Sequence, residues 1–362
     1  MGLFNWSQRA GNNSNQYHVE NLTVNQGITE ERAREIYKEL IPQTINEYTK
    51  DAYALANERI EKLENSMLER AKTVQEIIPA FSDPAFQRIL RKAQQAATVT
   101  DEKRDYDLLT ELLVCHVEKG KEKRNRAGIE KALEIVDKVD NRALCGLTAI
   151  HAFETFVPMT GDMEHGLEVL GGMFEKLEYE EFPQGTDWID HLDILNAVRI
   201  SPLSGFNKLI EYYPKRLQGY SCVGIRKDSE TYKKAVEMLQ SVKLNEAGCL
   251  IPNSLLDGYV KLNIRSKEHI RELIINSPQG NRMIDSEEVA VLESIWDSYD
   301  RTDLLQKQVD EVFVQRWDSI ESLRKFHEWW DTIPTGFDIT SAGKILAHTN
   351  AKRCDPSLPD LL

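Results

Sequence analysis

The chain has 362 residues, of which 41% are hydrophobic and 29% are charged, a composition that excludes a wholly disordered chain. Fifty-nine acidic residues against 45 basic ones give a formal net charge of −14. This balance argues against a general nucleic-acid binder, because binding to phosphates needs a basic surface. The one dense basic run, 119–126 (KGKEKRNR), is interpreted as a solvated turn between helices, and a local basic groove is the alternative.

Cysteine usage and hydropathy indicate the compartment. The five cysteines are an odd number and none has the CxxC spacing of a metal site, which is typical of a reducing cytoplasm. No stretch approaches the roughly 20 consecutive apolar residues of a membrane span. The start of the sequence also lacks the apolar run of a signal peptide. We therefore expect a cytoplasmic protein without stable membrane insertion.

The first 27 residues differ from the rest of the chain. Residues 1–15 are rich in Asn, Ser and Gly, which favours loops. In 16–26, Tyr17 and Val19 alternate with polar residues, and Leu22 and Val24 do so one step out of phase, which predicts a short strand with a bulge. A lone short strand is unstable in water, so we expect pairing with a second copy of the chain. Docking on the chain's own helices and disorder are the alternatives.

A long helical region follows Gly27, with Thr29 as the predicted N-cap and Pro42 as a predicted kink or break. Beyond Tyr53 the apolar residues recur at alternating steps of three and four, as in a heptad seam. The seam residues predicted to contact a second subunit are Ile60, Leu63, Met67, Val74 and Ile77. Arg70 is a polar interruption. A helix packed within its own domain is the equally weighted alternative to a coiled coil.

The remainder reads as amphipathic helices joined by short polar turns, which predicts an all-α protein, either a multi-helix bundle or an irregular helical array. Helices are expected near 85–97, 106–118, 127–138, 142–156, 163–178, 230–242, 267–276, 286–298, 303–316, 318–332 and 340–351. The domain organisation that we predict is an N-terminal segment (1–27), a long helix region (28–79), a helical domain (80–180), a second helical domain (181–352) and a tail (353–362).

The search for catalytic motifs gives weak candidates. The sequence has no phosphate-binding loop, dinucleotide fingerprint, nucleophile elbow or HExxH motif, and no cofactor is predicted. Asp187, Asp190 and His191 would share a helix face and could bind a hydrolytic metal, but acidic residues there also stabilise a helix N-terminus. His151 beside Glu154 could be a general base, although a buried structural histidine is the commoner case. The aromatic run 326–330 is expected to close a core, with a binding hot spot as the alternative.

The segments 1–4 (MGLF), 11–16 (GNNSNQ) and 21–29 (NLTVNQGIT) resemble the start of a family of uncharacterised bacterial proteins. That family begins with MGLF, then a G-[DN]-N-S-x-Q element, a short β-like run ending at Gly, and a long helix. The segments that carry the resemblance are 1–4, 11–16, 21–29, 82–87, 107–114 and 338–344. The last of these is also similar to the chain end of abortive-infection α-type proteins. The resemblance implies a bacterial cytoplasmic protein, brings no catalytic residues, and suggests antiviral defence.

These observations lead to one main functional hypothesis and two alternatives. The main hypothesis is a non-enzymatic, homo-oligomeric helical protein that binds an unidentified protein or small molecule, as a scaffold or as a sensor and effector in antiphage defence. A metal-dependent hydrolase that uses Asp187, Asp190 and His191 is the first alternative. A membrane-acting effector that exposes an amphipathic helix is the second, although the seam helix carries acidic as well as basic residues and so matches anionic lipids poorly.

Overall fold

The computed structural model describes residues 29–45, 50–201, 205–277 and 280–360. Within these ranges it contains sixteen α-helices, one 3-10 helix and seven short strands, so the predicted mainly helical fold class is confirmed. The predicted β segment at 16–26, with Tyr17, Val19, Leu22 and Val24, lies outside the described residues. None of the helices in these ranges has the length and apolar character that crossing a membrane requires.

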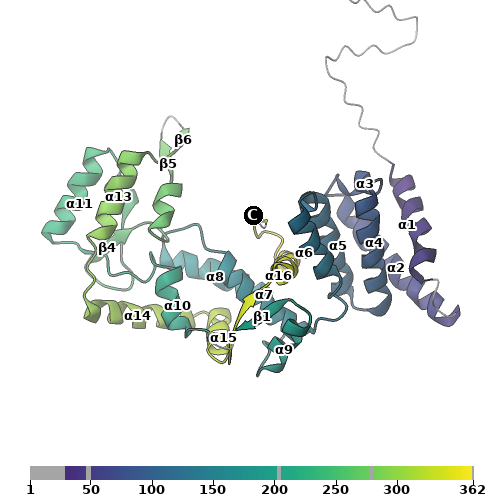
Figure 1. The fold of residues 1–362 in the computed structure, drawn as a ribbon. Coiled ribbons are helices and arrows are strands. Elements are labelled where there is room, and N and C mark those ends of the chain that lie inside the picture. The colour runs from purple at the N-terminus through teal and green to yellow at the C-terminus, as the bar shows by residue number, and fades with distance from the viewer. Residues whose placement is uncertain (1–28, 46–49, 202–204, 278–279, 361–362) are drawn as a thin grey trace, which may run out of the picture.

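Six helices form a block at the N-terminal end of the described chain (Figure 1). They are α1 (Glu30–Ile45), α2 (Lys50–Ala71), α3 (Ile77–Ala80), α4 (Pro84–Val99), α5 (Lys103–Lys119) and α6 (Lys123–Leu133). Helix α2 packs against both α4 and α5. The hydroxyl of Tyr37 in α1 donates a hydrogen bond to the carbonyl of Ile60 in α2 at 2.8 Å. Asp83 caps α4 by accepting a hydrogen bond from the N–H of Ala85, which fixes where that helix begins.

The apolar seam of α2 and its continuation faces the inside of this block. The seam residues buried in the chain's own core are Ala56, Ile60, Leu63, Met67 and Ile77. Val74 is partly buried, and Arg70 forms an ion pair with Glu111 of α5 at 2.6 Å. Packing within one chain therefore accounts for the apolar spacing, in agreement with the interpretation of a helix packed within its own domain. A role of these residues in assembly stays a prediction.

A central body follows the block and carries the aromatic core. Its elements are α7 (Asn141–Thr155), α8 (Met163–Leu177), α9 (Asp187–Ile194), β1 (Val198–Ser201), α10 (Leu209–Arg216), α14 (Asp303–Asp318), α15 (Glu321–Trp330), β7 (Gly336–Ile339) and α16 (Ser341–Cys354). Strands β1 and β7 pair antiparallel, with Val198 opposite Ile339. Phe326, Trp329 and Trp330 of α15 are buried, which confirms the predicted structural role of the aromatic run.

A smaller lobe, residues 222–299, is inserted between α10 and α14 and has a core of its own. Its elements are β2 (Ile225–Arg226), α11 (Glu230–Ser241), α12 (Glu246–Cys249), β3 (Leu250–Pro252), β4 (Tyr259–Leu262), η1 (Glu268–Glu272), β5 (Ile274–Ser277), β6 (Gly280–Met283) and α13 (Ser286–Asp297). Strand β4 lies between β2 and β3 in a three-stranded antiparallel sheet. The chain enters and leaves the lobe at one point, because the N–H of Asp300 donates to the carbonyl of Gly224 at 2.8 Å.

The predicted helix at 267–276 is wrong in its second half. The structure has a 3-10 helix over Glu268–Glu272 and then strand β5, which pairs with β6 so that Ile274 lies opposite Met283. The two successive isoleucines, Ile274 and Ile275, are β-branched and favour extended backbone. The apolar spacing that indicates a helix here therefore comes from a short helical turn followed by a hairpin.

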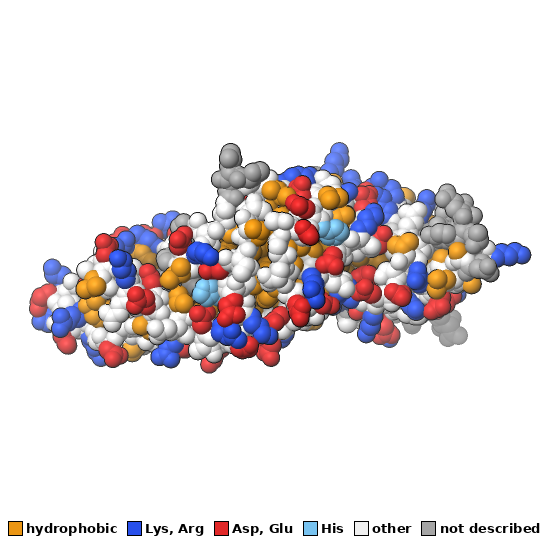
Figure 2. All heavy atoms as spheres, turned by 90° about the horizontal axis from the view of Figure 1, so that it is seen from below, with side chains coloured by type: hydrophobic (Ala, Val, Ile, Leu, Met, Phe, Trp, Pro, Cys, Tyr) orange, Lys and Arg blue, Asp and Glu red, His pale blue; other side chains and the backbone are white. Residues whose placement is uncertain are grey.

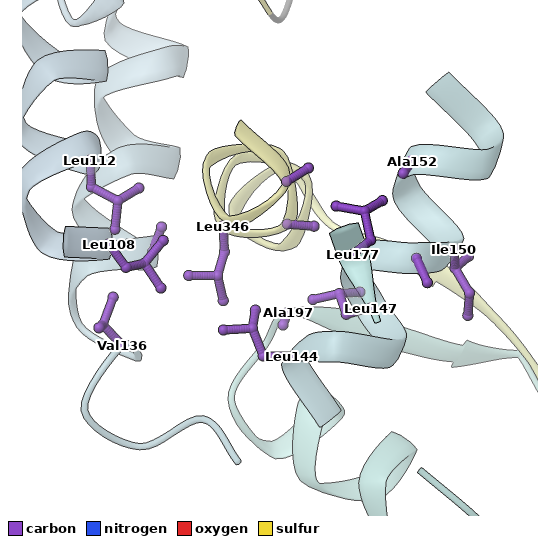
Figure 3. Close-up of a cluster of buried hydrophobic side chains, with 14 of the residues drawn as sticks. Leu108, Leu112, Val136, Leu144, Leu147, Ile150, Ala152, Leu177, Ala197 and Leu346 are labelled. Carbon is purple, nitrogen blue, oxygen red and sulfur yellow. The ribbon is translucent and has the colours of Figure 1, made fainter. Parts of the chain in front are cut away.

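The last helix, α16, joins the block to the body. It packs against α5 and α6 on one side and α7 on the other. In Figure 3, Leu346 of α16 lies between Leu108 and Leu112 of the block and Leu144 and Leu147 of the body. The block and the body therefore share one continuous core, whose buried residues range from Ala33 to Ala351 and which does not include the separate core of the lobe. Acidic and basic side chains are interspersed over the face shown in Figure 2, so the net charge of −14 is not gathered into one patch on that face.

We expect Gly343→Ala to lower the free energy of unfolding by about 2 kcal/mol, which chemical denaturation would measure. A Cβ atom at Gly343 would lie 2.0 Å from the backbone oxygen of Ala197, so the start of α16 would have to shift away from β1. Gly172→Ala in α8 is the matched control, since a Cβ there meets nothing within 4 Å. The control should be stabilising by about 0.5–1 kcal/mol, and equal effects of the two substitutions would contradict the prediction.

Candidate functional site

A concave, mainly apolar surface lies at the centre of the described chain. It is a pocket of about 670 Å³, within the range typical of small-molecule sites. Three separate segments line it: helix α8 with the loop 155–160 before it, the C-terminal tail 355–359, and Arg265 of the lobe. In Figure 1 the segment that follows α16 lies between the lobe and the N-terminal block, near α8. We call this feature the central pocket.

The sequence around α8 explains why the pocket has an apolar wall. Asp162 caps α8 by accepting a hydrogen bond from the N–H of His165 at 2.8 Å, which starts the helix directly after the loop. Leu170 and Met173 face the core and also reach the pocket. Val169 is 48% exposed and Met159 is 76% exposed, although both are apolar. These two side chains add apolar surface to the pocket, and the rest of the described chain leaves that surface exposed.

One polar donor at the pocket has an incomplete set of partners. Arg265 donates from Nη2 to the carboxylate of Glu272 at 2.7 Å, whereas its Nη1 meets only the thioether sulfur of Met159 at 2.9 Å. A thioether is a weak acceptor, so an anionic oxygen would be a better partner for Nη1. The Arg265 side chain is only 16% exposed, which fixes the donor at the pocket wall.

The C-terminal tail is fixed in place by charge and by hydrogen bonds. Lys176 of α8 forms an ion pair with Asp355 at 2.8 Å, and Asp355 also accepts from the hydroxyl of Ser357 at 2.6 Å. Asp355 is buried, and Leu358 packs against the main core. Lys352 of α16 forms an ion pair with Asp360. The tail therefore makes one side of the central pocket while its last described residue is bound to α16.

A pair of buried histidines lies directly behind the pocket wall. His151 Nε2 and His348 Nδ1 are 3.4 Å apart, and His151 Nδ1 is 3.3 Å from the hydroxyl of Thr155. The ring of Phe156, which lines the pocket, packs against both imidazoles. Burial, with smaller contributions from His348 and Lys344, lowers the pKa of His151 to about 4. Burial also lowers the pKa of His348 to about 4, with help from Lys352 and Lys119. Both imidazoles are neutral near neutral pH.

The sequence was compared with protein families, curated proteins and solved structures. The model of an uncharacterised-like protein family matches residues 27–359, which is most of the chain. The chain belongs to this family. The match takes in every residue of the central pocket, and it begins after the N-terminal motifs at 1–4 and 11–16. No curated protein and no solved structure matches the chain.

In this family member, the Asp187, Asp190 and His191 cluster is not assembled as a metal site. The residues lie on α9, but His191 Nε2 accepts a hydrogen bond from the backbone N–H of Asp140 at 3.1 Å, at the start of α7. Asp187 and Asp190 lie in the first turn of α9, where acidic side chains favour the helix N-terminus. In the described part of the chain, no group of three or more His, Cys, Asp or Glu side chains is arranged to bind a metal ion.

Sequence reasoning missed the residues of the central pocket, and it did not pair the two histidines. His151 was singled out beside Glu154, yet its partner in space is His348, which lies 197 residues later. One signal was present: Val169 falls on the polar side of the predicted helix 163–178, next to Glu168. An apolar residue on the outer face of a helix is compatible with a binding surface, but the tail and Arg265 reach the pocket only through the fold.

Proposed function

We propose that this protein is a ligand-binding sensor whose central pocket binds a small amphipathic molecule with an anionic head group. The observation that carries the proposal is the pocket itself, because three separate segments line it, namely α8 with its preceding loop, the C-terminal tail and Arg265 of the lobe. A ligand that contacts all three would stabilise one arrangement of lobe, tail and body, which is the basis of a ligand-dependent change in state.

The chemistry of the lining selects the ligand class. Phe156, Val169 and Met159 offer apolar surface to a hydrocarbon or aromatic body. The Nη1 donor of Arg265 has only the sulfur of Met159 as its partner. The imidazole of His165 also lines the pocket. The one acid in the lining, Asp355, is already paired with Lys176. An anionic head group would therefore find a hydrogen-bond donor in this pocket, whereas a cationic head group would find no unpaired acid in its lining.

Probe binding to a pocket-filling variant tests this proposal. We would titrate the full chain with 1-anilinonaphthalene-8-sulfonate and displace the probe with decanoate, following fluorescence. Val169→Trp places an indole in the pocket and should weaken probe binding by about tenfold or more. Val99→Trp is the matched control, since Val99 is an exposed valine at the end of α4, away from the pocket. Arg265→Gln should weaken decanoate more than decanol.

Two outcomes would contradict the proposal. One is equal probe affinity in Val169→Trp and Val99→Trp, which would place the probe elsewhere on the chain. The other is equal loss of decanoate and decanol binding in Arg265→Gln, which would remove the recognition of an anionic head. Hydrogen exchange should also slow in the tail 355–359 when decanoate is bound, because the tail lines the pocket. Self-assembly and an antiviral setting stay predictions from the sequence.

A further inference from the structure

The basic run 119–126 gathers lysine and arginine side chains in a chain that is acidic overall. It covers the end of α5 and the start of α6. Within the described residues, Lys121, Lys123, Arg124 and Arg126 form no ion pair. Elsewhere in the same block, Lys92 of α4 is paired with both Glu130 and Glu134. In a chain with a net charge of −14, this cluster is therefore a local site of positive charge.

The cluster borders a pocket of about 390 Å³ that is distinct from the central pocket. Its cations come from three helices: Lys119 from the end of α5, Arg124 from α6 and Lys344 from the first turns of α16. Glu122 is the one acidic residue of the lining, so basic residues outnumber acidic ones there. Arg124 and Lys344 have no ion-pair partner in the described part of the chain. We call this feature the α6–α16 pocket.

Close packing of α6 on α16 brings together the two helices that carry these charges. A Cβ atom at Gly128 of α6 would lie 2.6 Å from Cδ1 of Ile345, the flexible end of a side chain of α16, so the two helices are in close contact here. The hydroxyl of Thr340 accepts from the N–H of Gly343 at 3.1 Å and caps α16 where Lys344 projects. The packing of α6 on α16 therefore places Arg124 and Lys344 on neighbouring helices.

The lining combines charge with apolar and neutral polar groups. Ile345, which is partly exposed, contributes apolar surface, and Asn125 and Ser341 contribute an amide and a hydroxyl. A simple inorganic anion would use only the cations. A phosphorylated molecule with an uncharged ring system would use both parts, because its phosphates could contact Arg124 and Lys344 while its ring contacts Ile345.

We propose that the α6–α16 pocket binds a phosphorylated small molecule of the nucleoside phosphate class. The guanidinium of Arg124 suits phosphate because its planar fork can donate two parallel hydrogen bonds. Lys344 adds a point charge from the opposite helix. A long nucleic acid is disfavoured, because it would extend from this small basic site over a chain that carries an excess of 14 negative charges.

Calorimetric titration of the full chain with ATP, tripolyphosphate and adenosine tests the proposal. ATP should bind, tripolyphosphate should bind more weakly, and adenosine should bind weakest. The double variant Arg124→Gln and Lys344→Gln should lose at least about tenfold in ATP affinity. Both residues are exposed, so the variant should fold, and circular dichroism would verify this. Lys307→Gln on α14 is the matched control, since Lys307 is exposed and lies outside the pocket.

Each remaining outcome overturns the proposal. These outcomes are no ATP binding at about 1 mM, unchanged ATP affinity in the double variant, adenosine binding as tight as ATP, and tighter binding of a single-stranded oligonucleotide than of ATP. The Val169→Trp variant should bind ATP normally, because Val169 does not line this pocket. If one variant loses probe binding in the central pocket and still binds ATP, or loses ATP binding and still binds the probe, the two sites bind their ligands independently.

Discussion

Replacing Phe326 by alanine is expected to lower the free energy of unfolding by about 3–5 kcal/mol. The ring is fully buried in α15 and lies at the centre of the aromatic core. Its centroid is 4.2 Å from that of Phe174 and 5.2 Å from that of Phe153, so the substitution leaves a cavity and removes ring contacts on two helices. Urea denaturation followed by far-ultraviolet circular dichroism would measure the change.

The control for this substitution is Leu304→Ala in α14. Leu304 is 75% exposed, so its removal should change the free energy of unfolding by less than about 0.5 kcal/mol. Because Phe326 lies in the larger core, the Phe326→Ala variant should destabilise the body first, and the separate core of the lobe should persist to higher denaturant. A Phe326→Ala variant as stable as Leu304→Ala would show that the aromatic core is not packed as described.

The paired histidines should make the protein lose stability in acid. The pKa of each histidine is about 4 in the folded chain, against 6.5 for an unperturbed histidine. Between these values the unfolded chain binds more protons than the folded chain, so the free energy of unfolding falls as the pH falls from 6.5 to 4. The pair should account for a loss of about 3–5 kcal/mol over this range.

The double variant His151→Gln and His348→Gln isolates this effect. Glutamine does not titrate, so the variant should lose less stability than the natural chain between pH 6.5 and 4, as measured by urea denaturation. His165→Gln is the control, because the His165 side chain is 65% exposed and should leave the pH dependence unchanged. Equal pH dependence in the natural chain and the double variant would contradict the prediction. Lys344, Lys352 and Asp360 are retained in all variants.

Much of the helical architecture could be predicted from the sequence, because local signals determine it. Asp83, Asp162 and Thr340 each precede an apolar pattern and each caps a helix in the structure. These signals depend on residues a few positions apart, so one sequence suffices to find them. The hairpin of the lobe was missed because its strands are only four residues long, too short to show an alternating pattern against a helical one.

The candidate sites were mostly beyond reach of the sequence, since their parts come from distant segments. Arg265, Val169 and the tail meet only because the lobe and α16 fold back onto α8. Lys344 meets Arg124 for the same reason, although the basic run itself was noticed. The opposite case is the cluster Asp187, Asp190 and His191, whose members are close in sequence but lie at helix ends. Their spacing alone could not show whether other segments supply further ligands for a metal.

The position of α16 has a consequence for how the protein is made. The helix is the last element of the described residues, yet it fills the space between the N-terminal block and the body. While the chain is still on the ribosome, the facing surfaces of α5, α6 and α7 have no partner to cover them. The lobe, by contrast, has its whole core within residues 222–299 and can complete itself earlier. The main core can therefore close only after α16 has been synthesised.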